Sequence, residues 1–364
     1  MRERFASAGP DKTASALATF CRRPPLRAGS VWFTLRALGV GTRRIYRLQP
    51  EKRSMMSAVA VIDLGSNSIC LLVARLQADG ELVVIEKIKD AARLRDEIDG
   101  RGQLSAVGMQ RALSALQHFA TVVQRYNAKV RVVATAALRA ASNADIFVAR
   151  ALAETGLEVD IISGDIEARL AYKGVLFGMG ELPGDALCAD VGGGSTELVL
   201  GRNGIALETC SVPVGALTVT RDLLGPDPVS RTQIAAAIAG IRDQFKPTIG
   251  AFANRRGLFG VATSGTIQRI ARISLALSGA PRQDVQGLLL TREDYDQVTE
   301  IIAKASTNAQ RLRIPGMDPV RADILLGGAL IYQVLATDLG LAAWTVSMAG
   351  LRTGVLAELI ENQR

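Results

Sequence analysis

The chain has 364 residues, of which 48% are hydrophobic and 4% aromatic, a composition typical of a folded α/β protein and unlike that of a disordered chain. The net charge of +8 is carried by residues 1–56, which hold 12 Lys and Arg against 3 Asp and Glu, while the remaining residues hold 31 against 32. A nearly neutral body has no large basic surface, so nucleic acid is not expected as a partner.

Residues 1–56 are predicted to form a basic N-terminal extension that is disordered or precedes the true start, because Met55 and Met56 lie directly before the first predicted strand. The longest apolar run, 324–337, is shorter than the ~20 residues of a membrane-spanning helix, so no membrane association is expected. The four cysteines lack metal-ligand spacing, and the single histidine, His118, lies within a helical pattern. These features argue against a histidine-based site and favour a reducing, cytoplasmic setting.

The body begins at Ser57 with a run of short strands. In chain order we predict strands at 58–62, 69–76 and 82–88, a helix at 105–126, a strand at 130–134, a helix at 144–154, a strand at 158–162 and a helix that continues to 175. Asp79-Gly80 is expected to turn the chain between the second and third strands. Asn143 and Asp165 are expected to cap the last two helices.

The pattern then restarts. We predict strands at 186–189, 197–201 and 205–212, helices at 216–224 and 231–245, a strand at 258–262, helices at 266–277, 292–305 and 319–336, a strand at 344–348 and a final helix at 351–360. Asp63 and Asp190, which lie 127 residues apart, each end the first strand of a similar β-turn-β-β unit. This analogy predicts two duplicated α/β lobes facing each other across a cleft, at 57–178 and 179–364, with the last helix able to pack back on the first lobe.

Two glycine-rich turns connect strands at equivalent places, Asp63-Leu-Gly-Ser-Asn-Ser and Asp190-Val-Gly-Gly-Gly-Ser-Thr-Glu. Glycine lets the backbone approach a ligand closely, and successive N–H groups in such turns form concavities that bind anions. The acidic residue at each strand end can hold a metal ion, so a phosphate with its cation is expected between the turns. Each turn alone is also compatible with an ordinary hairpin. Neither is a Walker A loop, because lysine is absent, nor a Rossmann fingerprint, because a strand follows each turn.

Further residues could face the same cleft. Ser264-Gly265-Thr266 opens a helix after a strand, so its N–H groups could receive an anion, although Ser264 could simply cap the helix. Glu167 lies in a first helical turn, where the helix dipole favours a carboxylate, and the alternative is a general base aimed at a water. Arg139 and Arg352 each follow a strand and could pair with a phosphate, whereas a lone arginine is more often a surface residue.

Six segments, in this order, resemble the blocks of the exopolyphosphatase and guanosine-pentaphosphate phosphatase family. They are Val61-Ile-Asp-Leu-Gly-Ser-Asn-Ser, Val133-Ala-Thr-Ala-Ala-Leu-Arg, Ile161-Ile-Ser-Gly-Asp-Ile-Glu-Ala-Arg, Ala189-Asp-Val-Gly-Gly-Gly-Ser-Thr-Glu-Leu, Ala262-Thr-Ser-Gly-Thr and Gly350-Leu-Arg. The resemblance extends over residues 57–364. It implies an α/β, actin-like (ribonuclease H-like) two-lobed ATPase fold with mixed sheets flanked by helices.

The resemblance also implies a role for each matched residue. Glu167 corresponds to the general base that activates the attacking water, and Arg139 to an arginine near the substrate phosphates. Asp190 and Glu197 correspond to acidic residues that organise Mg²⁺, and Asp63 has the equivalent place in the first turn. The expected phosphate-binding residues are Gly65, Ser66, Asn67 and Ser68 in the first turn, Gly192, Gly193, Gly194, Ser195 and Thr196 in the second, and Ser264, Gly265 and Thr266 in the third.

The chain departs from the family pattern at several places. Ile166 replaces the first residue of a frequent Glu-Glu pair, Thr353 stands where Glu is frequent, and Arg93-Leu-Arg-Asp stands where Arg-Leu-Gly is often found. Long family members add C-terminal helical domains that bind extended polyphosphate, so high processivity is not expected of this chain.

The resemblance, together with the two glycine-rich turns, implies a Mg²⁺-assisted hydrolase that releases terminal phosphate from polyphosphate or guanosine pentaphosphate. An actin-like kinase that uses ATP stays open as a second class, although no acceptor site or adenine pocket is recognisable. A non-catalytic polyphosphate-binding regulator is the third class, and the intact Glu167, Asp190 and Glu197 argue against it. We expect a cytoplasmic protein, and a homodimer is compatible with the sequence.

Overall fold

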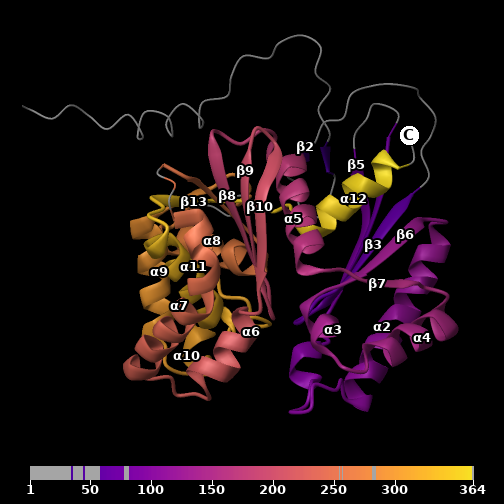
Figure 1. Cartoon of the computed structure of the whole chain (residues 1–364), viewed down its shortest axis with the longest axis horizontal. Helices are drawn as coiled ribbons and strands as arrows, with labels where there is room; N and C mark the ends of the chain where they lie inside the picture. The colour runs from indigo at the N-terminus through magenta and orange to yellow at the C-terminus, as the bar shows by residue number, and fades with distance from the viewer. Residues whose placement is uncertain are drawn as a thin grey trace, which may run out of the picture.

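The computed structural model describes residues 34–35, 44–45, 58–77, 82–253, 255, 257–280 and 284–362. In this part of the chain two mixed β-sheets flanked by helices lie side by side (Figure 1). The predicted Asp79-Gly80 turn and most of the predicted extension, including Met55 and Met56, lie outside the described residues. Within the extension, β1 (Thr34–Leu35) and β2 (Arg44–Ile45) form a short antiparallel pair. None of the helices in the described ranges has the length and apolar character needed to cross a bilayer.

The first sheet has the strand order β5-β4-β3-β6-β7. Its strands are β3 (Val59–Leu64), β4 (Ile69–Leu76), β5 (Leu82–Asp90), β6 (Lys129–Ala134) and β7 (Val159–Ile161). The helical elements that follow them are η1 (Leu94–Glu97), α2 (Ala106–Arg125), α3 (Ala136–Ala140) and α4 (Ala144–Thr155). All six residues of the central strand β3 are buried, and Phe119 of α2 and Phe147 of α4 share one apolar core with Ile62 of this strand.

The second sheet has the strand order β10-β9-β8-β11-β13-β12. Its strands are β8 (Asp185–Val191), β9 (Thr196–Arg202), β10 (Ile205–Val212), β11 (Phe259–Thr263), β12 (Leu289–Thr291) and β13 (Ala343–Val346). The helical elements around it are α6 (Ala216–Thr218), η2 (Val219–Leu224), α7 (Arg231–Ala253), α8 (Gly265–Leu277), α9 (Arg292–Lys304), α10 (Asn308–Arg311) and α11 (Leu325–Asp338). The almost wholly apolar α11 is buried against the sheet, where the rings of Tyr332 and Trp344 meet edge to face at 5.3 Å.

The two sheets open in the same way. In each, three successive strands pair antiparallel, and the next strand along the chain pairs parallel with the first of them. The turns after the first strands also close alike, because Gly65 N donates to Ser68 O (3.1 Å) and Gly192 N donates to Ser195 O (2.9 Å). The mixed α/β fold with two duplicated lobes is therefore confirmed.

Two helices join the lobes, because each packs on the sheet of the lobe to which it does not belong in sequence. Helix α5 (Gly164–Met179) follows the first sheet in the chain but shares an apolar core with β8, β9 and β11 of the second. Helix α12 (Leu351–Glu361) ends the described chain and shares an apolar core with β3, β4 and β6 of the first sheet. Figure 1 shows α5 between the two sheets and α12, in yellow, running from beside α5 across the upper part of the first lobe.

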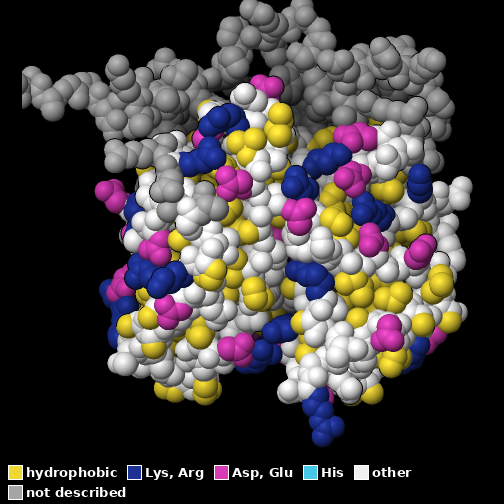
Figure 2. Space-filling view, viewed as in Figure 1, with side chains coloured by type: hydrophobic (Ala, Val, Ile, Leu, Met, Phe, Trp, Pro, Cys, Tyr) yellow, Lys and Arg dark blue, Asp and Glu magenta, His cyan; other side chains and the backbone are white. Residues whose placement is uncertain are grey.

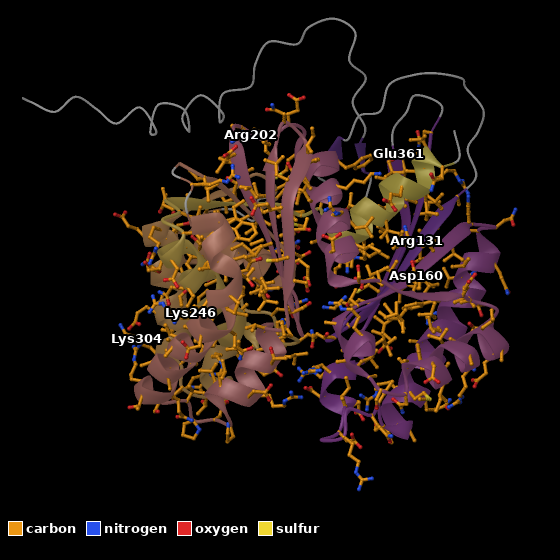
Figure 3. The ribbon with its side chains drawn as sticks, in the orientation of Figure 1. Arg131, Asp160, Arg202, Lys246, Lys304 and Glu361 are labelled. Atoms are coloured by element: carbon orange, nitrogen blue, oxygen red, sulfur yellow. The ribbon has the colours of Figure 1, made fainter. Side chains whose placement is uncertain are left out.

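The two exchanged helices cross at glycines. A methyl group on Gly174 would lie 2.7 Å from the carbonyl carbon of Gly350, and one on Gly354 would lie 2.7 Å from that of Leu170. Only glycine permits this approach of the two backbones. Lys173 of α5 is also paired with Glu361 at the end of α12, 2.6 Å away, and Glu361 is labelled in Figure 3.

Two predicted caps are wrong. Ser163, and not Asp165, caps α5, because its Oγ accepts a hydrogen bond from Ile166 N (3.3 Å) while Asp165 pairs with Arg169. Asn143 does not cap α4. Its amide instead accepts a hydrogen bond from the N–H and donates one to the C=O of Leu104, 39 residues earlier. In both places the side chain expected to cap the helix is bound to another polar group and is not available to the helix N–H groups.

Other predicted boundaries also change. The helix expected at 319–336 begins at Leu325, because Asp318 Oδ1 accepts from Val320 N (3.1 Å) and folds the preceding residues into turns. The helix expected at 216–224 is α6 followed by the π-helical η2, and α7 continues to Ala253. The short elements α3 and β12 were not predicted.

Charges of both signs are mixed on the surface of the described residues. On the face drawn in Figure 2, Lys and Arg side chains alternate with Asp and Glu over both lobes. Many form ion pairs, such as Arg131 with Asp160 at 3.2 Å, both labelled on the first lobe in Figure 3. This face therefore carries no single-sign field, in keeping with the balanced charge of the body.

Candidate active site

The two glycine-rich turns, one from each sheet, lie against each other. A methyl group on Gly193 would come within 3.2 Å of Ser66 Cβ and 3.3 Å of Asn67 Cβ, and one on Gly194 would lie 2.5 Å from Ser66 Oγ. The absence of side chains in the second turn is what allows this approach. The turns expected to share one anion thus meet at the junction of the lobes.

A row of polar side chains crosses the first sheet beside its turn. Asp63 of β3 is paired with Cys70 of β4, which is paired in turn with Lys89 of β5. Paired residues of neighbouring strands project to the same face, so a carboxyl, a thiol and an ammonium group lie side by side. Arg352 of α12 joins them, because its Nη1 donates to Asp63 Oδ2 at 2.9 Å. Cys70 and Lys89 were not singled out from the sequence, because the register of the strands is needed to find them.

A corresponding row crosses the second sheet. Asp190 of β8 is paired with Glu197 of β9 on one side and with Thr263 of β11 on the other. Glu197 is 2% exposed, and its Oε1 accepts a hydrogen bond from Ser211 Oγ of β10 at 2.8 Å. The second lobe therefore presents two adjacent carboxyl groups directly beside its glycine-rich turn.

Glu167 lies in the first turn of α5 and is 8% exposed. Arg139 of α3, which follows β6 directly, donates from Nη1 to Glu167 Oε2 (2.6 Å) and to Ile162 O (3.1 Å). The Nη2 atom of Arg139 is 3.9 Å from Glu197 Oε1, so this arginine lies between two carboxyl groups. The pair formed by Arg139 and Glu167 joins the first sheet to the helix packed on the second.

Burial raises the pKa of Glu167 to about 7, against the opposing effect of the Arg139 guanidinium. Burial likewise raises the pKa of Asp190 to about 6, with a further contribution from Asp63. The pKa of Glu197 is raised well above its usual range by burial and by the Glu167 carboxylate. A carboxyl group with a pKa near neutrality is suited to accept a proton at physiological pH.

Asp63 and Asp190 suit a divalent cation. In the described part of the chain no three His, Cys, Asp or Glu side chains are arranged to enclose a metal ion. Mg²⁺ is commonly held by one or two carboxylates together with water and substrate phosphates, so two carboxylates suffice. A cation beside them would lower the pKa of Asp190, which burial and the nearby Asp63 carboxylate raise. Glu197 is paired in register with Asp190, and its Oε1 also accepts from Ser211 Oγ, so its predicted part in holding the ion stays a prediction.

The third predicted segment lies beside the Asp190 row, because β11 pairs directly with β8. Ser264 has a φ of 97°, which residues other than glycine rarely adopt, and its Oγ accepts a hydrogen bond from Thr266 N at 3.1 Å. A methyl group on Gly265 would lie 2.5 Å from the guanidinium carbon of Arg321. Arg321 thus covers the start of α8, and the sequence analysis missed it because 319–336 was expected to be helical throughout.

One predicted phosphate ligand has its side chain engaged elsewhere. Thr196 is fully buried, and its Oγ1 donates to Val214 O at 2.6 Å. The hydroxyl therefore fixes the start of β9 to Val214, two residues after β10, and its proton is not available to a phosphate. Its backbone still belongs to the turn, which Gly192 and Ser195 close.

Comparison with known proteins relates this chain to a family of phosphatases. The family model described as the Ppx/GppA phosphatase family matches residues 72–363. A guanosine-5'-triphosphate,3'-diphosphate pyrophosphatase of Vibrio campbellii is 31% identical over 308 residues, and the match covers 84% of this chain but 60% of that relative.

Two solved structures are similar over nearly their whole length. The Aquifex aeolicus member of the Ppx/GppA family has a TM-score of 0.72 at 26% identity, covering 85% of this chain and 99% of that one. An exopolyphosphatase from Cytophaga hutchinsonii has a TM-score of 0.77 at 25% identity, covering 84% and 98%.

Proposed function

The chain belongs to the Ppx/GppA phosphatase family, and we propose that it is a hydrolase releasing the terminal phosphate of inorganic polyphosphate or guanosine pentaphosphate. The observation that carries the proposal is the placing of Glu167, with a pKa near 7, against Arg139 at the junction of the lobes where the two glycine-rich turns meet. The Vibrio relative is named as a guanosine-5'-triphosphate,3'-diphosphate pyrophosphatase and the Cytophaga protein as an exopolyphosphatase. The chain spans 60% of the Vibrio relative, so both substrates remain proposals here.

In the proposed reaction, Glu167 accepts a proton from a water molecule as that water attacks the terminal phosphorus. The bond between this phosphorus and the bridging oxygen breaks, and the shortened chain leaves. Backbone N–H groups of the two turns would hold the terminal phosphate in place and offset its charge, as in other phosphoryl-transfer sites. Arg139, placed between Glu167 and Glu197, lowers the pKa of the base against the effect of burial and would also contact a phosphate oxygen of the substrate.

Mg²⁺ is part of the proposal, and Asp63 and Asp190 are the residues that would hold it. When bound, the ion would offset the charge of the transferred phosphoryl group and of the leaving oxygen. We also propose that the protein is cytoplasmic, since Cys70, Cys188 and Cys210 are free thiols among the described residues.

The direct test is to measure phosphate release from polyphosphate, guanosine pentaphosphate and ATP in parallel, with Mg²⁺ and with EDTA. We expect release from at least one of the first two substrates and its loss in EDTA. Transfer of phosphate from ATP to a metabolite, with no release from either proposed substrate, would instead support the kinase alternative. Tight polyphosphate binding without release would support the regulator.

Replacing Arg139 by glutamine is expected to shift the pH profile of phosphate release to higher pH. The Arg139 charge lowers the pKa of Glu167 against the effect of burial, so its removal raises that pKa further above about 7. Because the ionised base is the active form, the midpoint of kcat/KM must rise with this pKa. Arg150→Gln, which removes an exposed pair with Glu154 on α4, is the matched control. An unchanged midpoint in the Arg139 variant, or one at lower pH, would argue against Glu167 as the base.

A further inference from the structure

The segment that follows β5 is hydrogen-bonded to the first glycine-rich turn. Arg93 N donates to Asn67 O (3.2 Å) and Arg95 N donates to Ser66 O (3.1 Å). Arg93 has a φ of 47°, in the left-handed region, and so turns the chain into η1 at the point where these bonds form. The position of the first turn therefore depends on where this segment is held.

The same segment reaches across to the second lobe. The Nη2 atom of Arg93 is 2.6 Å from Asp323 Oδ2, in the turns that precede α11. Arg221 of η2 also donates from Nη1 to Arg95 O at 3.4 Å. These two contacts link Arg93 and Arg95, three and five positions after the end of β5, to two separate elements of the other lobe.

The elements reached in the second lobe support the second glycine-rich turn. Ala216 N donates to Gly192 O (2.9 Å) and Leu217 N donates to Gly193 O (2.8 Å), so α6 holds this turn by its backbone. Helix α11 packs closely on α6, because a methyl group on Gly327 would lie 2.7 Å from Ala216 O. A continuous path of contacts thus runs from Asp323 through α11 and α6 to the second turn.

We infer that Arg93 and Asp323 are positioning residues whose ion pair holds the two phosphate-binding turns together in the ligand-free protein. The inference rests on the proposed function only in that the turns bind the substrate phosphate. The side chains are 34% and 32% exposed, and a pair with this exposure ordinarily changes an equilibrium by about two- to fivefold. Asp323 Oδ1 and Arg95 Nε are buried without hydrogen-bond partners, so loss of the pair would leave a half-buried carboxylate at a further cost.

The ion pair determines what fraction of the ligand-free protein has its lobes closed. When only a fraction of the protein is competent to bind, the apparent dissociation constant rises in inverse proportion to that fraction. Substrate binding then restores the closed form, so turnover at saturation is largely preserved. Loss of the pair should therefore raise KM and leave kcat nearly unchanged, whereas damage to the chemistry would lower kcat.

The test compares Arg93→Asp, Asp323→Arg and the double variant that carries both changes. Each single variant is expected to raise KM for the accepted substrate about twofold to fivefold with kcat nearly unchanged, and the double variant is expected to restore KM. Arg202→Gln, which breaks an exposed pair with Asp185 away from the turns, should leave both constants unchanged. Single variants with a wild-type KM, or a double variant as impaired as the singles, would overturn the inference.

A second readout separates this inference from the proposed function. Spin labels on the exposed positions Gln117 of α2 and Lys304 of α9 report the distance between the lobes without substrate. The single variants should show a longer or broader distance distribution than the wild type, and the double variant should return to it. If the wild type releases no phosphate from any substrate, the proposed function fails, and the distance measurement alone decides the ion pair. Identical distributions in all four proteins would overturn it.

Discussion

Replacing Glu167 by glutamine is expected to lower the rate of phosphate release by roughly 10²- to 10⁴-fold, the usual contribution of a positioned general base. Glutamine keeps the size of the side chain and can still accept the hydrogen bond from Arg139 Nη1, but it cannot take a proton from water. Because burial already raises the pKa of Glu167 to about 7, the neutral glutamine resembles a form that the folded protein populates near neutrality. Folding and substrate binding should therefore persist.

The measurement is kcat at saturating substrate, with the dissociation constant and the melting temperature determined alongside. Glu158→Gln is the matched control, because Glu158 is an exposed carboxylate of the first lobe that lies outside the candidate site. A Glu167 variant that turns over within threefold of the wild type would remove this residue from the mechanism. A variant that neither binds substrate nor melts cooperatively would show that the carboxyl group is needed for the fold.

Replacing Gly354 by alanine is expected to destabilise the protein by about 1–3 kcal/mol or more, the usual cost of forcing a methyl group into a packed interior. The new Cβ atom would overlap the carbonyl oxygen of Leu170 and lie 3.1 Å from Gly174 N. Backbone atoms of a helix cannot move aside as a flexible side chain can, so α5 and α12 must separate. Helix α5 carries Glu167 and α12 carries Arg352, so activity should fall together with stability.

The expected result is a lower midpoint of urea unfolding and a lower kcat in the same variant. Gly250→Ala is the matched control, since Gly250 lies in α7 and a methyl group there meets no atom within 4 Å. Alanine favours a helix over glycine by roughly 0.5–1 kcal/mol, so the control should be neutral or slightly stabilised. A Gly354 variant with wild-type stability and activity would mean that the close helix crossing is not required.

The duplicated lobes and the two turns could be predicted because their signals are local. The strand, the acidic residue and at least one glycine occur together within nine residues at Asp63 and again at Asp190. Each strand is a short apolar run, and the restart of the pattern marks the second lobe. The closing bonds of Gly65 and Gly192 lie within the same short segments, so the similarity of the turns follows from the sequence alone.

Contacts between distant segments could not be predicted in this way. Arg352 is 289 residues from Asp63, and its pairing depends on α12 returning to the first sheet. The packing of the last helix on the first lobe was among the expectations, but the packing of α5 on the second sheet leaves no local signal except small residues, and glycine is common in loops as well. Arg139 was singled out as a possible phosphate ligand, but its place against Glu167 depends on the unpredicted helix α3. Tertiary packing decided each of these features, and local propensity did not.

The crystal structure of the Glu167→Gln variant with Mg²⁺ and a short polyphosphate tests the central claim most directly. It should show the terminal phosphate within hydrogen-bonding distance of backbone N–H groups from both glycine-rich turns. The side chain at position 167 should face the water molecule that is placed to attack the terminal phosphorus. A phosphate chain bound to one turn only, or bound away from the junction of Gly193 with Ser66, would contradict the account.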